Sequence, residues 1–213
     1  MPRPTKRAPE RGDAKTRLLE AARDTIRAKG FAATSLDDLC AAAAVTKGSF
    51  FHHFKSKDDL GVAAARYWAE TTTAFFAAAP YHRHDDPLAR VLAYVAFRKA
   101  ILVGELAEVS CLVGTMVQEV HATSPAIRDA CADSIFGHAA TLEEDLAKAI
   151  RARGVRGVTA AGLARHTQAV IQGAFVLAKA GNDVQLARDT LDHLDRYLRL
   201  LFDEPTRKGS RRA

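Results

Sequence analysis

The chain has 213 residues, of which 48% are hydrophobic and 26% are charged, and its formal net charge at pH 7 is +6. This length suits one or two small domains, and the apolar content is ample for a globular core. No run of about 18 apolar residues occurs, so no membrane span is expected. The polar residues 2–13 lack the apolar stretch of a signal peptide. The three cysteines are widely spaced and do not suggest a disulfide framework. We therefore expect a cytoplasmic protein.

The excess positive charge is concentrated at the amino-terminal end. Residues 1–57 carry 12 Lys or Arg and 6 Asp or Glu, whereas the remainder carries 19 of each. A basic segment joined to a neutral or acidic body is typical of proteins that bind a polyanion such as DNA. Residues 1–12 are predicted to be a flexible basic arm that reaches phosphate or a minor groove, or else a solubilising tail. Residues 206–213 form a second basic tail.

Three helix starts occur within residues 34–60, TSLDDLCAAAAVTKGSFFHHFKSKDDL. Ser35, Thr46 and Ser56 each precede a short helical pattern, and each can accept a hydrogen bond from the free N–H groups of a first turn. An aspartate follows both Ser35 and Ser56 at capping-box spacing. Helices this short bury little surface, but they suit a helix–turn–helix that presents its second helix to a DNA groove.

The second of these helices has the composition of a recognition helix. Phe50 and Phe54 lie four residues apart and are expected to face inward, which leaves a polar outer face. Gly48 costs about 1 kcal/mol of helix stability against alanine but lets another backbone approach closely. Taken singly, each outer residue also fits a solvated polar surface. We expect phosphate contacts from Thr34, Ser35, Thr46 and Lys57, and contacts to bases or adjacent backbone from Lys47, Gly48, Ser49, Phe51, His52 and His53.

The order VTKGSFFHHFKSKDDL resembles the recognition-helix signature of TetR-type (tetracycline-repressor-like) regulators. In that family a triplet of small or polar residues precedes an apolar residue, an aromatic, any residue, His or Tyr, an aromatic, and then Ser-Lys. The preceding helix, residues 13–29, fits the same pattern, so the resemblance covers residues 1–60. The chain has Phe51 where the family usually has Tyr. A phenylalanine cannot bond a phosphate, although it can pack on sugar or a thymine methyl, and His52 or His53 can supply a polar contact.

Beyond residue 56 the sequence has helical periodicity and no sustained period-two alternation, so the predicted fold is all-α. The predicted domains are a helix–turn–helix domain, 13–57, and an effector-binding and dimerisation domain, 58–205. With the helix over residues 13–29 and the two short helices that follow Ser35 and Thr46, the total is about nine, and the later ones are expected at residues 56–79, 87–104, 105–121, 124–154, 159–180 and 183–202.

Apolar and small residues recur at three- and four-residue steps along the last two predicted helices. They face either the core of their own chain or a second copy of it. TetR regulators pair through their last two helices into a four-helix bundle, so the resemblance favours a homodimer. Two-fold symmetry would place two recognition helices about 34–36 Å apart and implies a palindromic operator. The predicted interface residues are Leu163, Val170, Gly173, Ala174, Leu177, Leu191, Leu194, Leu198 and Leu201.

Large side chains in the middle helices are expected either to fill a core or to line a pocket. In the TetR family a pocket among these helices binds a small molecule. The resemblance gives that role to Trp68, Phe75, Phe97, Cys111, Met116 and Phe136.

The segment SCLVGTMVQEV around Cys111 is similar to a Gly-Cys-Leu segment in one branch of the family, some of whose members sense electrophiles or oxidants. Ser110 replaces the glycine, and no Lys or Arg lies within several residues to stabilise a thiolate. A redox role for Cys111 is therefore a hypothesis beside a purely structural one.

Together these patterns predict a homodimeric, ligand-responsive transcriptional regulator, a repressor with an activator as the alternative. Its predicted partners are double-stranded DNA and a small-molecule effector. No HExxH, paired CxxC, P-loop or GxGxxG pattern occurs, so no catalytic site, metal or cofactor is expected. Two other classes remain open, a DNA-binding protein without sequence preference and a helical enzyme or carrier.

Overall fold

The structure is a computed structural model that describes residues 13–203. Within that range the chain forms eleven α-helices, one short 3-10 helix and no strand, so the predicted all-α class is confirmed. The predicted basic arm, 1–12, and basic tail, 206–213, lie outside the described residues. The elements are α1 (Ala14–Lys29), α2 (Leu36–Ala43), α3 (Lys47–His53), α4 (Lys57–Ala77), η1 (Pro80–Arg83), α5 (Pro87–Ala100), α6 (Leu106–Val109), α7 (Leu112–Val120), α8 (Pro125–Ala140), α9 (Glu143–Arg153), α10 (Ala160–Gly181) and α11 (Val184–Asp203).

The helix predicted over residues 105–121 is divided into α6 and α7. Ser110 between them has extended backbone angles, and its carbonyl accepts a hydrogen bond of 2.8 Å from Nε of Arg27. Cys111 then begins α7, its Sγ accepting from the Gly114 N–H at 3.4 Å. The backbone at the break is therefore bonded to Arg27 of α1, which is 83 residues away in sequence, so local sequence patterns do not predict it.

The helix predicted over residues 124–154 is divided into α8 and α9, so eleven α-helices replace the expected nine within the described part of the chain. At Thr141 and Leu142 the backbone N–H groups bond three residues back, as in a 3-10 turn. The Thr141 hydroxyl also donates to the His138 carbonyl at 2.7 Å, a side-chain bond that competes with the helical pattern.

The three predicted helix starts near the amino-terminal end are confirmed. Ser35 accepts from the Asp38 N–H at 3.1 Å while Asp38 accepts from the Ser35 N–H at 2.8 Å, so α2 has a complete capping box. Thr46 caps α3 by accepting from the Ser49 N–H at 3.1 Å. These bonds fix where the two short helices begin and hence how α3 is presented.

The start of α4 differs in one detail. Ser56 accepts from the Asp59 N–H at 3.1 Å, as expected of a cap. The Asp59 carboxylate, however, accepts from the Lys55 N–H at 2.9 Å. The reciprocal bond of a capping box is thereby made one residue earlier than its spacing predicted.

A sharp turn and two buried aromatics set the angle between α2 and α3. Ala44 ends α2 in the left-handed region, with φ 51°, where glycine is more usual. Phe50 of α3 and Phe54, which caps its carboxyl end, are 0% and 3% exposed and pack in one cluster with Leu39, as their spacing predicted. We refer to α1–α3 as the head and to α4–α11 as the body.

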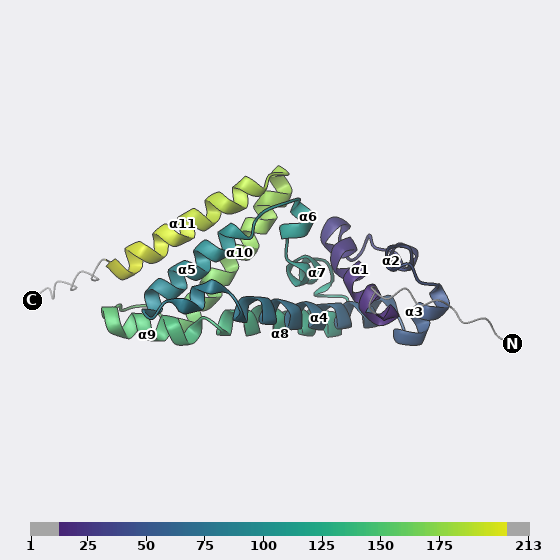
Figure 1. The fold of residues 1–213 in the computed structure, drawn as a ribbon, viewed down its shortest axis with the longest axis horizontal. Helices are drawn as coiled ribbons and strands as arrows, with labels where there is room; N and C mark the ends of the chain where they lie inside the picture. The colour runs from purple at the N-terminus through teal and green to yellow at the C-terminus, as the bar shows by residue number, and fades with distance from the viewer. Residues whose placement is uncertain (1–12, 204–213) are drawn as a thin grey trace, which may run out of the picture.

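The hydrophobic core of the head continues into the body. Leu18 of α1 and Phe50 of α3 belong to the same buried cluster as Met116 of α7 and Ile127 of α8. The predicted boundary after residue 57 therefore does not separate two cores. Figure 1 shows α4 and α8 running back from the head along one edge of the molecule.

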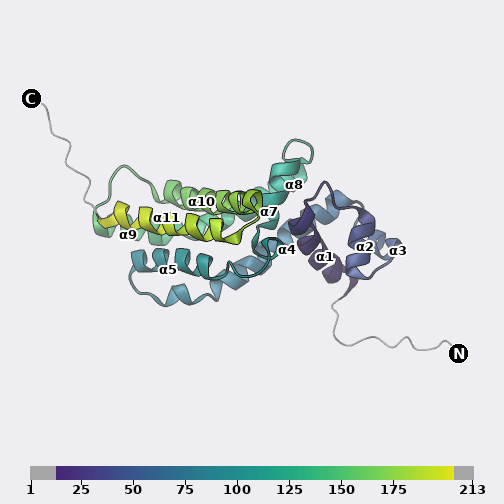
Figure 2. The same cartoon turned by 90° about the horizontal axis from the view of Figure 1, so that it is seen from above.

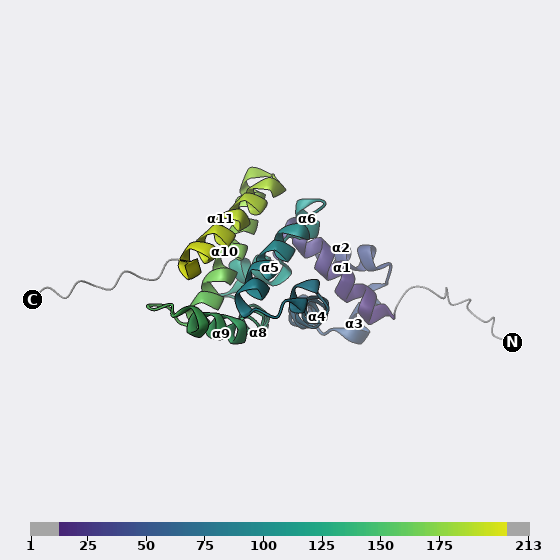
Figure 3. The same ribbon diagram turned by 60° about the vertical axis from the view of Figure 1, so that its left-hand side comes forward.

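A second buried cluster fills the other end of the body, between α5, α9, α10 and α11. The long helices α10 and α11 lie side by side there, as Figures 2 and 3 show from two further directions. Among residues 13–203, no helix has both the length and the apolar character needed to cross a membrane.

Candidate functional site

The outer face of α3 is the first candidate site. Lys47, Gly48 and His52 are exposed there, while Ser49 and His53 are half-buried. Phe51 is 56% exposed, an unusual position for a large aromatic side chain in water. The short helix thus presents a cation, polar groups and one aromatic ring to its surroundings.

Gly48 is not required by packing within the chain. A Cβ at this position would meet only Oγ1 of Thr46, at 3.8 Å, which is ordinary contact distance. Alanine would fit and would favour the helix. Packing within the described part of the chain therefore gives no reason for a glycine at this position.

Lys47 forms an ion pair with Asp37 of α2. Their Nζ and Oδ1 atoms lie 2.7 Å apart, and the two side chains are 59% and 72% exposed. The hydrogen bond and charge of Asp37 raise the pKa of Lys47. A carboxylate thus stands beside the main cation of α3, on the surface predicted to meet phosphates.

Thr34 and Lys57 are placed differently from their predicted phosphate role. Thr34 is 1% exposed, and its hydroxyl donates to the Gly30 carbonyl at 2.6 Å, so the prediction is wrong for this side chain. Lys57 is half-buried, and its ammonium donates to the carbonyls of Phe31 and Thr34 at 3.1 and 3.0 Å. Both side chains hold the turn between α1 and α2 in place.

Lys55 is an exposed cation that the sequence analysis did not select. It follows α3 directly, and its ammonium forms no ion pair with any described residue. Ser35 and Thr46, which were predicted to contact phosphate, are exposed but use their hydroxyl oxygens to cap α2 and α3.

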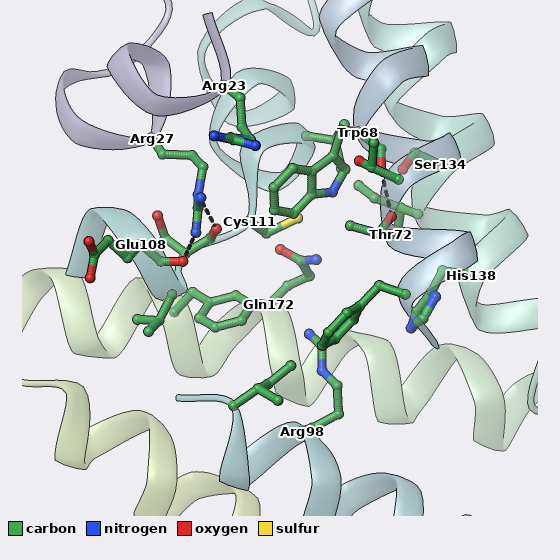
Figure 4. A pocket seen from close by; sticks show the side chains of 18 of the residues that line it. Arg23, Arg27, Trp68, Thr72, Arg98, Glu108, Cys111, Ser134, His138 and Gln172 are labelled. Atoms are coloured by element: carbon green, nitrogen blue, oxygen red, sulfur yellow. Dashed lines mark hydrogen bonds between the residues drawn. The ribbon is translucent and has the colours of Figure 1, made fainter. Parts of the chain in front are cut away.

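The second candidate site is a cavity of about 700 Å³ inside the molecule. Its walls come from α1 of the head and from α4, α5, α6, α7, α8 and α10 of the body. Figure 4 shows Arg23 and Arg27 entering from one side, Trp68 to the right of them, and Arg98 entering from the opposite side.

Three of the six residues predicted for an effector pocket line this cavity, namely Trp68, Phe75 and Cys111. The other three do not. Met116 is 0% exposed within the core shared with the head, and Phe136 is 58% exposed on the outer surface of α8. Phe97 lies behind the wall, its ring centroid 5.6 Å from that of Phe75.

The cavity also contains arginines that the sequence analysis missed. Arg23 is bonded to its neighbour Asp24 by two hydrogen bonds, of 2.7 and 2.9 Å. Arg27 donates to the backbone carbonyls of Ser110 and Glu108 and lies over the Trp68 ring. Two arginines four residues apart on one helical face were a visible signal, but nothing in the sequence showed that this face closes a cavity.

Arg98 of α5 lies over two rings, 5.0 Å from the Phe76 centroid and 5.9 Å from that of Phe175. It forms no hydrogen bond or ion pair with any residue in the described range. Nearby, Nε2 of His138 and the Tyr94 hydroxyl form a hydrogen bond of 2.9 Å. Burial, together with the charge of Arg98, lowers the pKa of His138 from 6.5 to about 4, so this ring is neutral at pH 7.

Two glutamines of α10 complete the wall. Gln168 is 5% exposed, and its Oε1 has no hydrogen-bond partner among the described residues. Gln172 is half-buried beside Cys111 and faces the cavity in Figure 4. A buried amide oxygen without a donor is costly, so a donor of some kind is expected to occupy this space.

Cys111 lies at the cavity wall, half-buried. Although no Lys or Arg is close to it in sequence, Arg27 and Lys179 interact with it electrostatically in the fold. The redox role stays a hypothesis.

The predicted dimer stripe is mostly directed into its own chain. Val170 and Leu201 are half-buried against the second core, whereas Gly173 and Leu177 are exposed. The open alternative, packing within one chain, therefore holds for the residues that are buried there: Leu163, Ala174, Leu191, Leu194 and Leu198.

A second apolar stripe, which shares Gly173 and Leu177 with the predicted one, is exposed on the same two helices. Its large side chains are between 39% and 57% exposed. The Tyr197 ring of α11 lies 5.1 Å from the ring of His166 on α10, so the two helices are in contact beside Tyr197. At Gly173 no atom lies within 4 Å of where a Cβ would stand. We call this the outer stripe, and its members are Gly173, Val176, Leu177, Leu186, Tyr197 and Leu200.

Two protein-family models match the chain, one over the head and the start of α4 and the other over much of the body. Residues 18–64 match the model described as "Bacterial regulatory proteins, tetR family". Residues 87–193, half of the chain, match the model "Transcriptional regulator LmrA/YxaF-like, C-terminal domain". The chain belongs to the TetR family. It is accordingly a DNA-binding transcriptional regulator, with its helix–turn–helix in α2 and α3.

Curated relatives of this TetR-family regulator match over limited stretches. The transcriptional regulator AcuR of Cereibacter sphaeroides is 29% identical over 115 residues, which are 54% of this chain and 52% of AcuR. The TetC protein of transposon Tn10 from Escherichia coli is 46% identical over 43 residues, 20% of this chain and 22% of that protein. The chain thus spans about half or less of the curated relatives it matches.

Solved structures agree in fold over most of the chain. A TetR-family regulator from Agrobacterium tumefaciens is 21% identical, with a TM-score of 0.75 over 86% of this chain and 96% of that one. The reduced form of NemR from Escherichia coli is 23% identical, with a TM-score of 0.74 over 91% and 100%. The regulatory protein TetR from Rhodobacter sphaeroides is 22% identical, with a TM-score of 0.76 over 86% and 98%.

Proposed function

We propose that this TetR-family protein is a cytoplasmic repressor that binds a palindromic operator as a homodimer and leaves it when a small molecule occupies the cavity. One observation carries the proposal. The cavity wall includes Arg23 and Arg27 of α1, which belong to the head, together with α4, α8 and α10 of the body. A molecule in the cavity therefore touches the DNA-binding segment directly.

The DNA contacts are assigned to α3 and the residue that follows its carboxyl end. Lys47, Ser49 and His52 would meet base edges or the adjacent backbone, with Phe51 against sugar or a thymine methyl. Lys55 replaces Lys57 as the proposed phosphate contact, because Lys55 is exposed and Lys57 is engaged within the chain.

The dimer is assigned to the outer stripe. Gly173 leaves space for close approach of a partner helix, and Leu177 and Leu200 are more than half exposed, which is costly in water for a monomer. A two-fold axis beside α10 and α11 would pair the same residues from both copies. Each copy would then carry one head to one half-site.

Coupling between cavity and head is proposed to run through the bonds that join them. Arg27 of α1 donates to the Ser110 carbonyl at 2.8 Å, and Glu119 of α7 accepts from the Ala32 N–H at 2.7 Å. A ligand that moves α6 or α7 would move α1 with it. Reducing operator occupancy a hundredfold requires about 2.7 kcal/mol of differential ligand binding between the two states.

An activator of the same family shares every feature named above, since the sign of regulation depends on where the operator lies. A DNA-binding protein without sequence preference would need no exposed Phe51 or space at Gly48. A carrier would use the cavity but would have no need of the head. The described residues contain no group of three or more His, Cys, Asp or Glu placed to hold a metal ion.

Selection of bound sequences from a random duplex pool tests the proposal. We expect recovery of an inverted repeat, and we expect the Lys47→Ala variant to bind the recovered repeat and its altered forms with less discrimination. Recovery of unrelated sequences with no common half-site would contradict operator recognition and favour the protein without sequence preference.

A further inference from the structure

The least satisfied charge in the cavity is that of Arg98. Its guanidinium has five N–H donors, yet this half-buried side chain makes no hydrogen bond or ion pair in the described part of the chain and lies over the rings of Phe76 and Phe175. Figure 4 shows the side chain rising from α5 into the cavity, opposite Arg27. Ring faces attract a cation but leave its donors without acceptors.

The other charged groups around the cavity do not compensate for Arg98. Asp24 is engaged by Arg23 at 2.7 Å, and the Glu108 carboxylate accepts from the Glu105 N–H at 3.0 Å to cap α6. Arg27 is satisfied by backbone carbonyls, which carry no net charge. Burial lowers the pKa of Arg27, as expected of a cation without a carboxylate partner. The cavity therefore has an uncompensated positive charge.

Apolar side chains make up the larger part of the rest of the wall, beside polar side chains such as those of Thr72, Ser134 and Gln172. Trp68 and Phe75 of α4 and Phe175 of α10 line it with flat rings. Against these, Gln168 offers one buried oxygen without a donor. The space of about 700 Å³ is within the range of cavities that hold small organic molecules.

We propose that the cavity binds a small carboxylic acid with an apolar body, its carboxylate paired with Arg98 and its apolar part packed on the rings of α4 and α10. A hydroxyl or N–H group on the ligand would satisfy the Oε1 of Gln168. The proposal rests on the proposed function, since it names the chemical class of the effector.

Two other ligand classes fit the cavity less well. A neutral apolar molecule would remove water from the Arg98 guanidinium without replacing its hydrogen bonds, which costs free energy. A strongly hydrated inorganic anion would pair with Arg98 but leave the rings of Trp68, Phe75 and Phe175 without contacts. A carboxylate on an apolar body meets both needs, because a guanidinium and a carboxylate form paired, charge-assisted hydrogen bonds.

The test measures binding to the full-length protein without DNA, by calorimetry and thermal shift. The probes are benzoate, cinnamate, 2-naphthoate and decanoate, each compared with its uncharged primary amide. We expect at least one acid to bind, and its amide to bind roughly tenfold or more weakly, because a hydrogen bond to a charged group is lost. Amides that bind as tightly as their acids, or no binding by any acid, would overturn the proposal.

Two variants locate the effect. Arg98→Gln is expected to weaken the acid roughly tenfold or more and to leave the amide unchanged. Lys99→Gln is the matched control, because the neighbouring Lys99 is paired with Asp192 at 2.6 Å outside the cavity. Acid binding retained in a folded Arg98→Gln protein would overturn the assignment. If Arg98→Gln does not fold, the comparison of acid and amide in the unaltered protein decides alone.

This assay is independent of the regulator proposal. Acid binding by a protein that selects no operator would contradict the regulator and leave the ligand class standing. Operator selection by a protein that binds acids no better than amides would contradict the ligand class and leave the regulator proposal standing.

Discussion

The ammonium of Lys47 lies 2.7 Å from the carboxylate of Asp37, so the exposed cation of α3 is paired with an acidic residue of α2. Both side chains are more than half exposed, and a pair this open contributes little to stability. Its effect is on the surface potential. We expect Asp37 to compete with an approaching phosphate for Lys47 and to add a repelling charge of its own.

The Asp37→Asn variant is therefore expected to bind all duplex DNA more tightly, by about threefold to tenfold at moderate salt, with little change in unfolding temperature. Fluorescence anisotropy with a labelled duplex measures this. Asp129→Asn, which removes an equally exposed partner of Arg128 on α8, is the control and should change nothing. Weaker DNA binding by Asp37→Asn would show that Asp37 positions Lys47 for its contact.

Removing the Lys57 side chain is expected to lower stability, whereas removing the Lys55 side chain is expected to weaken DNA binding. Lys57→Ala removes the donor that Lys57 supplies to the carbonyls of Phe31 and Thr34, of which the Phe31 carbonyl keeps the Thr34 N–H, and should lower the free energy of unfolding by about 1–3 kcal/mol. Lys55→Ala should leave stability unchanged, weaken binding to every duplex alike, and reduce the slope of log affinity against log salt by about one. Urea unfolding measures the stability of both variants, and salt titrations measure their DNA binding. A destabilised Lys55→Ala protein, or a Lys57→Ala protein of unchanged stability, would contradict the prediction.

The stability of the protein is expected to depend on His138 under mild acid. Its folded pKa is about 4, below the ordinary 6.5, so between these values the unfolded chain binds a proton that the folded chain excludes. The free energy of unfolding should therefore fall as pH drops from 6.5 toward 4, by up to about 3 kcal/mol from this residue. His138→Gln should flatten that dependence, whereas the exposed control His121→Gln should leave it steep. Equal slopes in all three proteins would contradict the assignment.

The outer stripe is expected to be the dimer contact. Leu177→Glu places a charge where 54% of an apolar side chain is exposed in the single chain, so it should yield a folded monomer at micromolar concentration. Val103→Glu is the control, because Val103 is 71% exposed but lies outside the stripe. Sedimentation velocity distinguishes the two. A Leu177→Glu protein that stays dimeric would exclude the stripe as the interface.

The sequence predicted the parts of the fold that depend on near neighbours. Ser35, Thr46 and Ser56 could be assigned as caps because the N–H groups they bond lie three residues away. The inward direction of Phe50 and Phe54 followed from their spacing within one helix.

Features that depend on distant contacts could not be predicted in the same way. Lys57 is a polar residue of a kind usually found at the surface, but its ammonium donates to the carbonyls of Phe31 and Thr34, more than twenty residues away in sequence. The leucines of α11 showed which face is apolar, but periodicity does not tell whether that face meets its own core or a second copy. The cavity joins Arg27, Arg98 and Gln168 from three helices, and no pattern in a single sequence relates them.

The most direct test of the whole account is the stoichiometry and spacing dependence of binding to the selected inverted repeat. Mass measurement of the complex should find two chains per duplex, because paired heads occupy half-sites about one helical turn, 34–36 Å, apart. Inserting about five base pairs between the half-sites rotates one of them by half a turn and should weaken binding at least roughly tenfold. One chain per duplex, or equal affinity for the spaced repeat, would contradict a dimer that reads DNA through two copies of α3.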